Sequence, residues 1–87
     1  MSETRIIKDA VLADFETEDS VLLDIDGKRY HRMNETGALI WKALEKKASD
    51  AEIVDQLMNT FEVTREQAEG SVRRFIADLA SRGLVRP

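Results

Sequence analysis

Two pairs of polar residues in the second half of the sequence indicate where helices begin. Glu52 follows Ser49 by three residues, and Gln67 follows Thr64 at the same spacing. In such a capping box, the hydroxyl accepts a hydrogen bond from a backbone N–H of the first helical turn, and the acid or amide bonds back to the N–H of the capping residue. We therefore expect one helix after Ser49 and another after Thr64. The short connection between them is typical of a helix-turn-helix.

Apolar spacing supports the last of these helices. Its apolar residues recur at the i, i+4, i+7, i+8, i+11 spacing of a single helix face. They are Ala68, Val72, Phe75, Ile76 and Leu79. Gly83 stands where a left-handed C-cap belongs, so we expect the helix to end near Arg82. Leu84 and Val85 would then fold back onto the core.

A third helix is expected earlier in the chain, over about residues 35–47, with Asn34 as its N-cap. Its apolar residues are Ala38, Leu39, Ile40, Trp41, Ala43 and Leu44. The helix after Ser49 carries an apolar stripe of Ile53, Val54, Leu57, Met58 and Phe61. We expect Trp41 to pack in the core rather than to bind a ligand, because its apolar neighbours recur at helical spacing.

The first third of the chain has the period-two alternation of half-buried strands. The pattern covers residues 10–15 and 21–25, and Asp26-Gly27 separates the second run from residues 28–33. Asp-Gly between two such runs favours a type I′ hairpin turn, in which both central residues need a positive φ. We therefore expect a three-stranded antiparallel meander over roughly residues 9–33. The predicted fold class is α+β, a winged helix-turn-helix-like arrangement of three strands followed by three helices.

The length of 87 residues allows a single domain. We expect a flexible N-terminal segment over residues 1–8 and the folded domain over residues 9–87. No apolar run approaches the roughly 18–20 residues needed to cross a membrane, and the N-terminus lacks the apolar centre of a signal peptide. We therefore expect a cytoplasmic protein without a membrane partner.

The residue types that carry catalysis are scarce. The chain has no cysteine, which excludes disulfides, thiolate zinc sites and a cysteine nucleophile. His31 is the only histidine, so a histidine-based metal cluster is also excluded. We interpret His31 as a strand residue that faces solvent or contacts a ligand. The four glycines are scattered and form no phosphate-binding loop. We therefore expect no enzyme activity, no metal and no cofactor.

The net charge of -4 averages over a basic segment. Lys28-Arg29-Tyr30-His31-Arg32 holds three formal positive charges within five residues of the predicted third strand. One interpretation is a solvated face or a protected sheet edge, because lysine and arginine on edge strands discourage unwanted pairing. The other is an open edge that accepts an acidic, extended peptide by strand addition, with the basic side chains favouring its encounter.

Two other classes of function stay open. Arg73 and Arg74 lie on the last predicted helix, which would be the recognition helix of a DNA-binding helix-turn-helix. From Ser49 to the C-terminus, however, five basic residues are outnumbered by seven acidic ones. Phosphate binding favours a basic stripe, so we expect no nucleic-acid partner. The second alternative is a scaffold or chaperone that binds a partner enzyme through an apolar patch.

The order and spacing of several segments resemble a known family. They are Val21-Leu22-Leu23-Asp24, Gly27-Lys28-Arg29-Tyr30, Met33-Asn34-Glu35-Thr36-Gly37-Ala38 with Ile40-Trp41, residues 53–57, residues 72–79 and Gly83-Leu84-Val85. The pattern is similar to the family of the pyrroloquinoline quinone biosynthesis protein D, also called the RiPP precursor peptide recognition element, over about residues 10–86. Residues 34–41 look most like the stand-alone members of lasso peptide biosynthesis. Met33 stands where leucine is common, which is a volume-conserving change.

The resemblance implies a non-catalytic protein that binds the leader segment of a ribosomally made precursor peptide. The leader would add as an antiparallel strand to the third strand and lie against the last helix. The protein would then present the precursor to a maturation enzyme, which in lasso pathways is a leader peptidase followed by a cyclase. Carried onto this sequence, the leader-binding residues would be Lys28, Arg29, Tyr30, His31, Arg32, Met33, Glu69, Val72, Arg73, Ile76 and Leu79.

Particular roles follow for some of these residues. Apolar leader side chains would enter a groove near Val72, Ile76 and Leu79. Leader carboxylates would pair with Arg29, Arg32 and Arg73. Phe75 and Ile76 are adjacent and so lie about 100° apart on a helix. We therefore expect one of these two side chains to face the groove between the last helix and the third strand.

Overall fold

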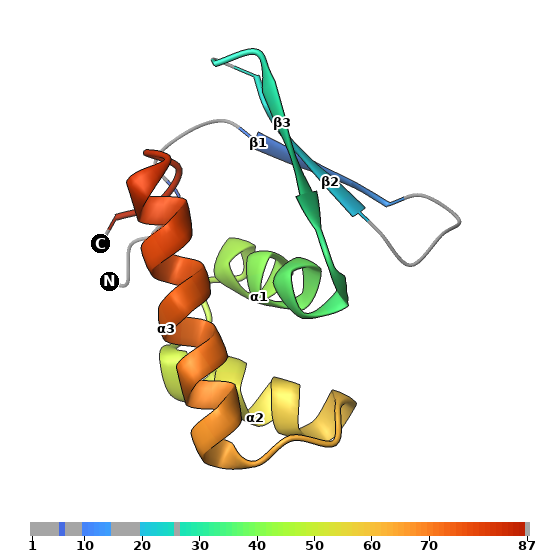
Figure 1. The fold of residues 1–87 in the computed structure, drawn as a ribbon, viewed down its shortest axis with the longest axis vertical. Helices are drawn as coiled ribbons and strands as arrows, with labels where there is room; N and C mark the ends of the chain where they lie inside the picture. Colours follow the sequence, from blue (N-terminus) through green and yellow to red (C-terminus); the bar gives the residue numbers. More distant parts are fainter. Residues whose placement is uncertain (1–5, 7–9, 15–19, 26, 87) are drawn as a thin grey trace.

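The chain forms an antiparallel sheet of three strands followed by three helices (Figure 1) in the computed structural model, which describes residues 6, 10–14, 20–25 and 27–86. The elements are β1 (Ala10–Asp14), β2 (Ser20–Asp24), β3 (Arg29–Met33), α1 (Glu35–Glu45), α2 (Asp50–Thr60) and α3 (Arg65–Ser81). The predicted α+β fold is therefore confirmed. Most of the segment predicted to be flexible, together with Phe15 and Asp26, lies outside the described residues.

Local side-chain hydrogen bonds fix where the helices begin. Ser49 and Glu52 form the predicted capping box of α2, with backbone-to-side-chain distances of 3.2 Å and 2.9 Å. Thr64 and Gln67 form the equivalent box of α3. Asn34 caps α1, because its Oδ1 accepts a hydrogen bond of 2.8 Å from a backbone N–H of the first turn. All three predicted helix starts are confirmed.

The helix ends are set by backbone conformation. After α3, Gly83 has a φ of 74°, and the N–H groups of Gly83 and Leu84 donate to the carbonyl oxygens of Ala80 and Leu79, each at 3.0 Å. This pair of bonds is a Schellman motif, and it turns Leu84 back into the core as predicted. The helix α1 ends two residues before the predicted residue 47, because Lys47 adopts a left-handed φ of 60°.

The turn between β2 and β3 differs from the prediction. The last paired residues are Asp24 and Arg29, so four residues form the connection where the sequence predicts two. The Asp24 carboxylate accepts a hydrogen bond of 3.0 Å from the N–H of Gly27. Lys28, with a φ of 54°, supplies the left-handed residue that returns the chain to β3. The hairpin is confirmed, but a side-chain bond from the strand end makes its turn longer.

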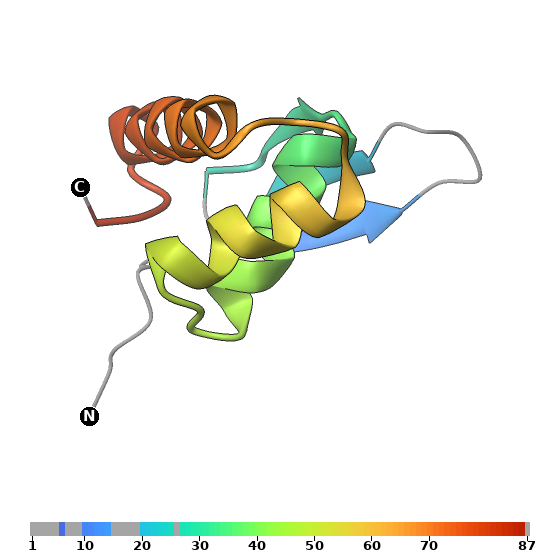
Figure 2. The same cartoon turned by 90° about the horizontal axis from the view of Figure 1, so that it is seen from below.

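The core lies between one face of the sheet and the helices. Its fully buried larger side chains are Trp41, Leu22, Ile40, Leu44, Ile53, Leu57, Leu79, Leu84 and Val85. The helix α1 lies between the sheet and α2, and α3 runs along the side of both helices (Figures 1 and 2). Met58 is 37% exposed, contrary to the prediction, because it lies at the margin of the buried face of α2. Val85 forms an isolated antiparallel bridge with Ile6.

Candidate functional site

The strand β3 lies at an edge of the sheet, as the strand-addition hypothesis requires. The strand order is β1-β2-β3, so β3 is hydrogen-bonded to β2 on one side only among the described strands. Its first two residues and Arg32 are exposed, whereas Met33 is buried against the core. An edge strand offers backbone N–H and C=O groups to a further strand.

The pairing register divides the basic segment between the two faces of the sheet. His31 pairs with Leu22, and because Leu22 is fully buried, His31 belongs to the inner face that turns toward the helices. Arg29 and Met33 share this face, since side chains alternate along a strand. Tyr30 and Arg32 therefore belong to the outer face. Lys28 lies in the turn rather than on the strand.

The outer face carries a row of exposed apolar side chains. Val11 pairs with Leu23, and Leu23 pairs with Tyr30, so the row crosses all three strands. Their exposed fractions are 50%, 42% and 70%. No helix of the described chain covers this face in Figures 1 and 2. Tyr30 therefore belongs to a different surface from His31, although the two residues are adjacent.

A cleft separates the β2–β3 hairpin from the C-terminal end of α3. It has a volume of about 380 Å³ and is lined by Asp24, Gly27, Arg29, His31, Ser81 and Arg82. We call it the β3–α3 cleft. Four of the lining residues come from the hairpin and two from the end of α3, so it lies where a peptide added to β3 would meet the helix.

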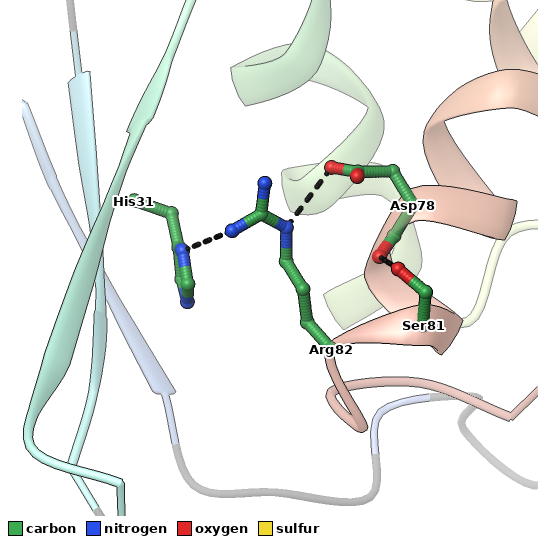
Figure 3. Close-up of polar contacts among 4 residues, drawn as sticks. All are labelled: His31, Asp78, Ser81 and Arg82. Carbon is green, nitrogen blue, oxygen red and sulfur yellow. Dashed lines mark hydrogen bonds and ion pairs between the residues drawn. The ribbon is translucent and has the colours of Figure 1, made fainter.

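A chain of polar contacts spans this cleft (Figure 3). Arg82 Nη1 lies 2.8 Å from His31 Nδ1, and Arg82 Nε donates to Asp78 Oδ2 at 3.1 Å. The hydroxyl of Ser81 donates to the carbonyl oxygen of Asp78 at 2.7 Å. Because a guanidinium only donates hydrogen bonds, His31 Nδ1 must be the acceptor. The bond from Arg82 therefore requires a neutral imidazole whose proton is on Nε2.

Arg82 was not among the residues that the sequence suggested for the site. Its spacing from Asp78 is the i, i+4 spacing of a helical ion pair, and that pattern could have drawn attention to it. The contact with His31 joins residues 51 positions apart in the chain. No local pattern predicts such a contact.

None of the helix residues suggested for the site lines the β3–α3 cleft. Glu69, Val72 and Arg73 instead line a second depression of about 280 Å³ with residues of α2 and the start of α3. These further residues are Asp50, Ala51, Val54 and Arg65. We call this second depression the α2–α3 depression. Leu79 is fully buried and Ile76 is partly buried, so Leu79 supports the core rather than a surface.

Phe75 lies on the side of α3 that meets the start of α1. A Cβ atom added to Gly37 would lie 2.8 Å from Phe75 Cε1 and 3.3 Å from Met33 Sδ. Phe75 is thus close to the residue that ends β3. Phe75, Asp78 and Arg82 are spaced at i, i+3 and i+7, which places them along one side of the helix.

The described residues contain no group of three or more histidine, aspartate or glutamate side chains that could hold a metal ion. Within the same residues, no helix is long and apolar enough to span a membrane. The side chains that line the β3–α3 cleft are all polar or charged apart from Gly27: two arginines, one histidine, one aspartate and one serine.

Comparison with known proteins places the fold and the cleft in a wider context. The sequence model of the family of coenzyme PQQ synthesis protein D (PqqD) matches residues 19–85. The solved structure of TbiB1 in complex with the TbiA(beta) leader peptide is 29% identical, has a TM-score of 0.82, and the match covers 94% of each chain. The structure of lasso peptide synthetase B1 complexed with the leader peptide is also 29% identical, with a TM-score of 0.81 and coverage of 95% of this chain and 96% of the other. No curated protein sequence matches significantly.

Proposed function

Because the chain belongs to the family of coenzyme PQQ synthesis protein D, we propose that it binds the leader segment of a ribosomally made precursor peptide. The two similar solved structures both hold a leader peptide, and one is named as a lasso peptide synthetase component. The precursor proposed here is therefore of the lasso type. The protein itself would catalyse nothing and would present the bound precursor to a maturation enzyme.

One observation carries this proposal: β3 is an edge strand that borders the β3–α3 cleft. An extended peptide can add to such an edge through backbone hydrogen bonds, which fix its register without depending on its sequence. Alternate side chains of the added strand would then point toward the helices, and the others toward the outer face. The cleft receives the first set, so selectivity for a particular leader arises there.

The side chains at the site bear on whether binding and catalysis belong to the same protein. The cleft holds one serine, one histidine and one aspartate, but each has another partner among the described residues: Ser81 donates to the Asp78 carbonyl, His31 contacts Arg82, and Asp24 accepts from the N–H of Gly27. We propose that a separate leader peptidase, followed by a cyclase, acts on the precursor while its leader is held. Because the precursor is made on ribosomes, the proposed place of action is the cytoplasm.

An NMR titration tests the function. Uniformly ¹⁵N-labelled protein is titrated with synthetic copies of the short peptides encoded beside its gene, and with the TbiA(beta) leader peptide for comparison. We expect saturable amide shifts in β3 and along the side of α3 that carries Phe75, Asp78 and Arg82, with a scrambled peptide as the control. Shifts that lie only in the α2–α3 depression would reject the site, and binding of none of the peptides would reject the function.

Slow hydrogen exchange distinguishes strand addition from side-chain docking. Strand addition gives the N–H groups of β3 that point away from β2 acceptors on the peptide, so amides within Arg29–Met33 should become protected when the peptide binds. The amides of β1, at the other edge, serve as the internal control. Equal changes at both edges, or no protection in β3, would contradict strand addition.

A further inference from the structure

The guanidinium of Arg82 is held in place but is not saturated. It has five N–H donors, of which Nε serves Asp78 and Nη1 serves His31. Among the described residues, no hydrogen bond is formed by Nη2. Arg82 lines the β3–α3 cleft and directs Nη1 toward His31, while Asp78 orients the guanidinium from the opposite side through Nε, which leaves Nη1 and Nη2 as the outer pair of donors (Figure 3). Two parallel donors of this kind match a carboxylate.

We propose that the Nη1/Nη2 edge of Arg82 is a receptor for a carboxylate side chain of the bound leader, which displaces His31 from Nη1. The inference rests on the proposed function and deepens it, because it states the chemistry of one leader residue. The leader recognised here carries an aspartate or glutamate at the position that pairs with His31.

The position follows from sheet geometry. A strand added to β3 lies about 4.7–4.9 Å away, and residues directly opposite each other have Cβ atoms about 4.5–5.5 Å apart. The leader residue opposite His31 also shares its face of the sheet, so its side chain enters the cleft beside the imidazole. Because His31 already lies within 2.8 Å of Arg82 Nη1, a carboxylate beside it comes within reach of the same guanidinium.

Exchange of His31 for a carboxylate is favourable because the two acceptors differ in charge. The imidazole is a neutral acceptor of a single hydrogen bond, whereas a carboxylate accepts two and carries the charge opposite to that of the guanidinium. Charged groups of both signs surround the guanidinium. Arg29 adds a second positive charge, Asp24 bonds with the N–H of Gly27, and Asp78 remains on Nε.

A double-mutant cycle between protein and peptide tests the receptor. A leader that binds in the titration above is resynthesised with an amidated C-terminus, so that its terminal carboxylate cannot act as a substitute. Each aspartate or glutamate is then replaced in turn by its amide, and Kd is measured for wild type and Arg82→Gln. One replacement should weaken binding to wild type roughly 5- to 30-fold and binding to Arg82→Gln less than about 2-fold.

Two variants complete the design. Arg82→Lys keeps the charge but loses the fork, so it should bind the acidic leader with intermediate affinity. Arg65→Gln is the matched control. Arg65 is an exposed arginine at the other end of α3, and it forms an ion pair with Asp55. Its replacement removes the same charge, and this variant should distinguish the acidic leader from its amide as well as wild type does. Amide spectra that match wild type confirm that the variants are folded.

The outcomes are distinct. The receptor is rejected if Arg82→Gln discriminates acid from amide as wild type does, or if a leader without any acidic residue binds equally tightly. In either case the leader still binds, so the proposed function survives. If wild type binds none of the peptides, both the function and the receptor are rejected.

Discussion

A Cβ atom on Gly37 would lie 2.8 Å from Cε1 of Phe75, so α1 and α3 approach each other through a residue without a side chain. Two more atoms crowd the same point, since Asn34 Oδ1 and Met33 Sδ would each lie 3.3 Å from that Cβ. The contact fixes α3 against the end of β3 and the start of α1. The position of the β3–α3 cleft therefore depends on it.

We predict that Gly37→Ala destabilises the protein by about 1–3 kcal/mol, because the new methyl group forces Phe75 and Met33 to move. Replacement of a glycine by alanine inside a helix otherwise stabilises by about 1 kcal/mol. Gly70 in α3 provides the contrast: its nearest neighbour would be Arg74 Nη1 at 3.5 Å, an ordinary contact at the end of a flexible side chain.

Urea denaturation of both variants measures the difference. Gly70→Ala should raise the free energy of unfolding by roughly 0.5–1 kcal/mol, whereas Gly37→Ala should lower it. If both substitutions stabilise the protein, the close approach between α1 and α3 is not a constraint.

The parts of the fold that sequence predicts well are those determined within a few residues. Ser49 with Glu52, and Thr64 with Gln67, each form both bonds of their box within one helical turn. Gly83 likewise ends α3 through bonds to the last turn. The turn after β2 is less predictable, because Asp24 bonds with the N–H of Gly27 and lengthens it.

The site is harder to predict because it depends on how α3 is rotated beside β3. Sequence identifies the edge strand and the helix, but not which side of the helix faces the strand. The suggested Glu69 and Arg73 lie at the α2–α3 depression, whereas Arg82 lies at the β3–α3 cleft. That rotation is set by tertiary contacts such as the one between Gly37 and Phe75, and these contacts have no signature in the local sequence.

Acid should weaken the start of α2 through Glu52. Hydrogen bonds from the backbone N–H and then the hydroxyl of Ser49 hold the pKa of Glu52 below its ordinary value. A lowered folded-state pKa means that the contribution to stability is present above the unfolded value and is lost as pH falls through the folded one. A ¹³C titration of the Glu52 carboxyl should therefore give a midpoint below about 4.3, the pKa of an unperturbed glutamate side chain.

Ser49→Ala is the control for this titration. It removes the hydroxyl but leaves the backbone N–H, so the pKa of Glu52 should move only part of the way back toward its ordinary value. A midpoint in the usual range in wild type would mean that the capping box does not persist in solution.

Trp41 should tolerate phenylalanine better than its complete burial suggests. The side chain is 0% exposed, and Nε1 has no hydrogen-bond partner among the described residues. A buried donor without a partner costs about 1–3 kcal/mol, so Trp41→Phe loses packing but also removes that penalty. We expect Trp41→Ala to cost about 3–5 kcal/mol and Trp41→Phe less than half as much, measured by circular dichroism in urea. A cost of Trp41→Phe above half that of Trp41→Ala would contradict an unpaired indole N–H.

The bond between His31 and Arg82 predicts the tautomer of the free protein. Since Arg82 can only donate, His31 Nδ1 must lack a proton and Nε2 must carry it. Long-range ¹H–¹⁵N spectra, recorded at alkaline pH where imidazole is neutral, should therefore show an unprotonated Nδ1. In Arg82→Gln the donor is a neutral amide on a shorter side chain, so its hydrogen bond to Nδ1 is weaker or lost. The Nδ1-protonated tautomer should then become more populated. A wild-type His31 with its proton on Nδ1 would mean that the contact across the β3–α3 cleft does not exist in solution, because two donors cannot share one hydrogen bond.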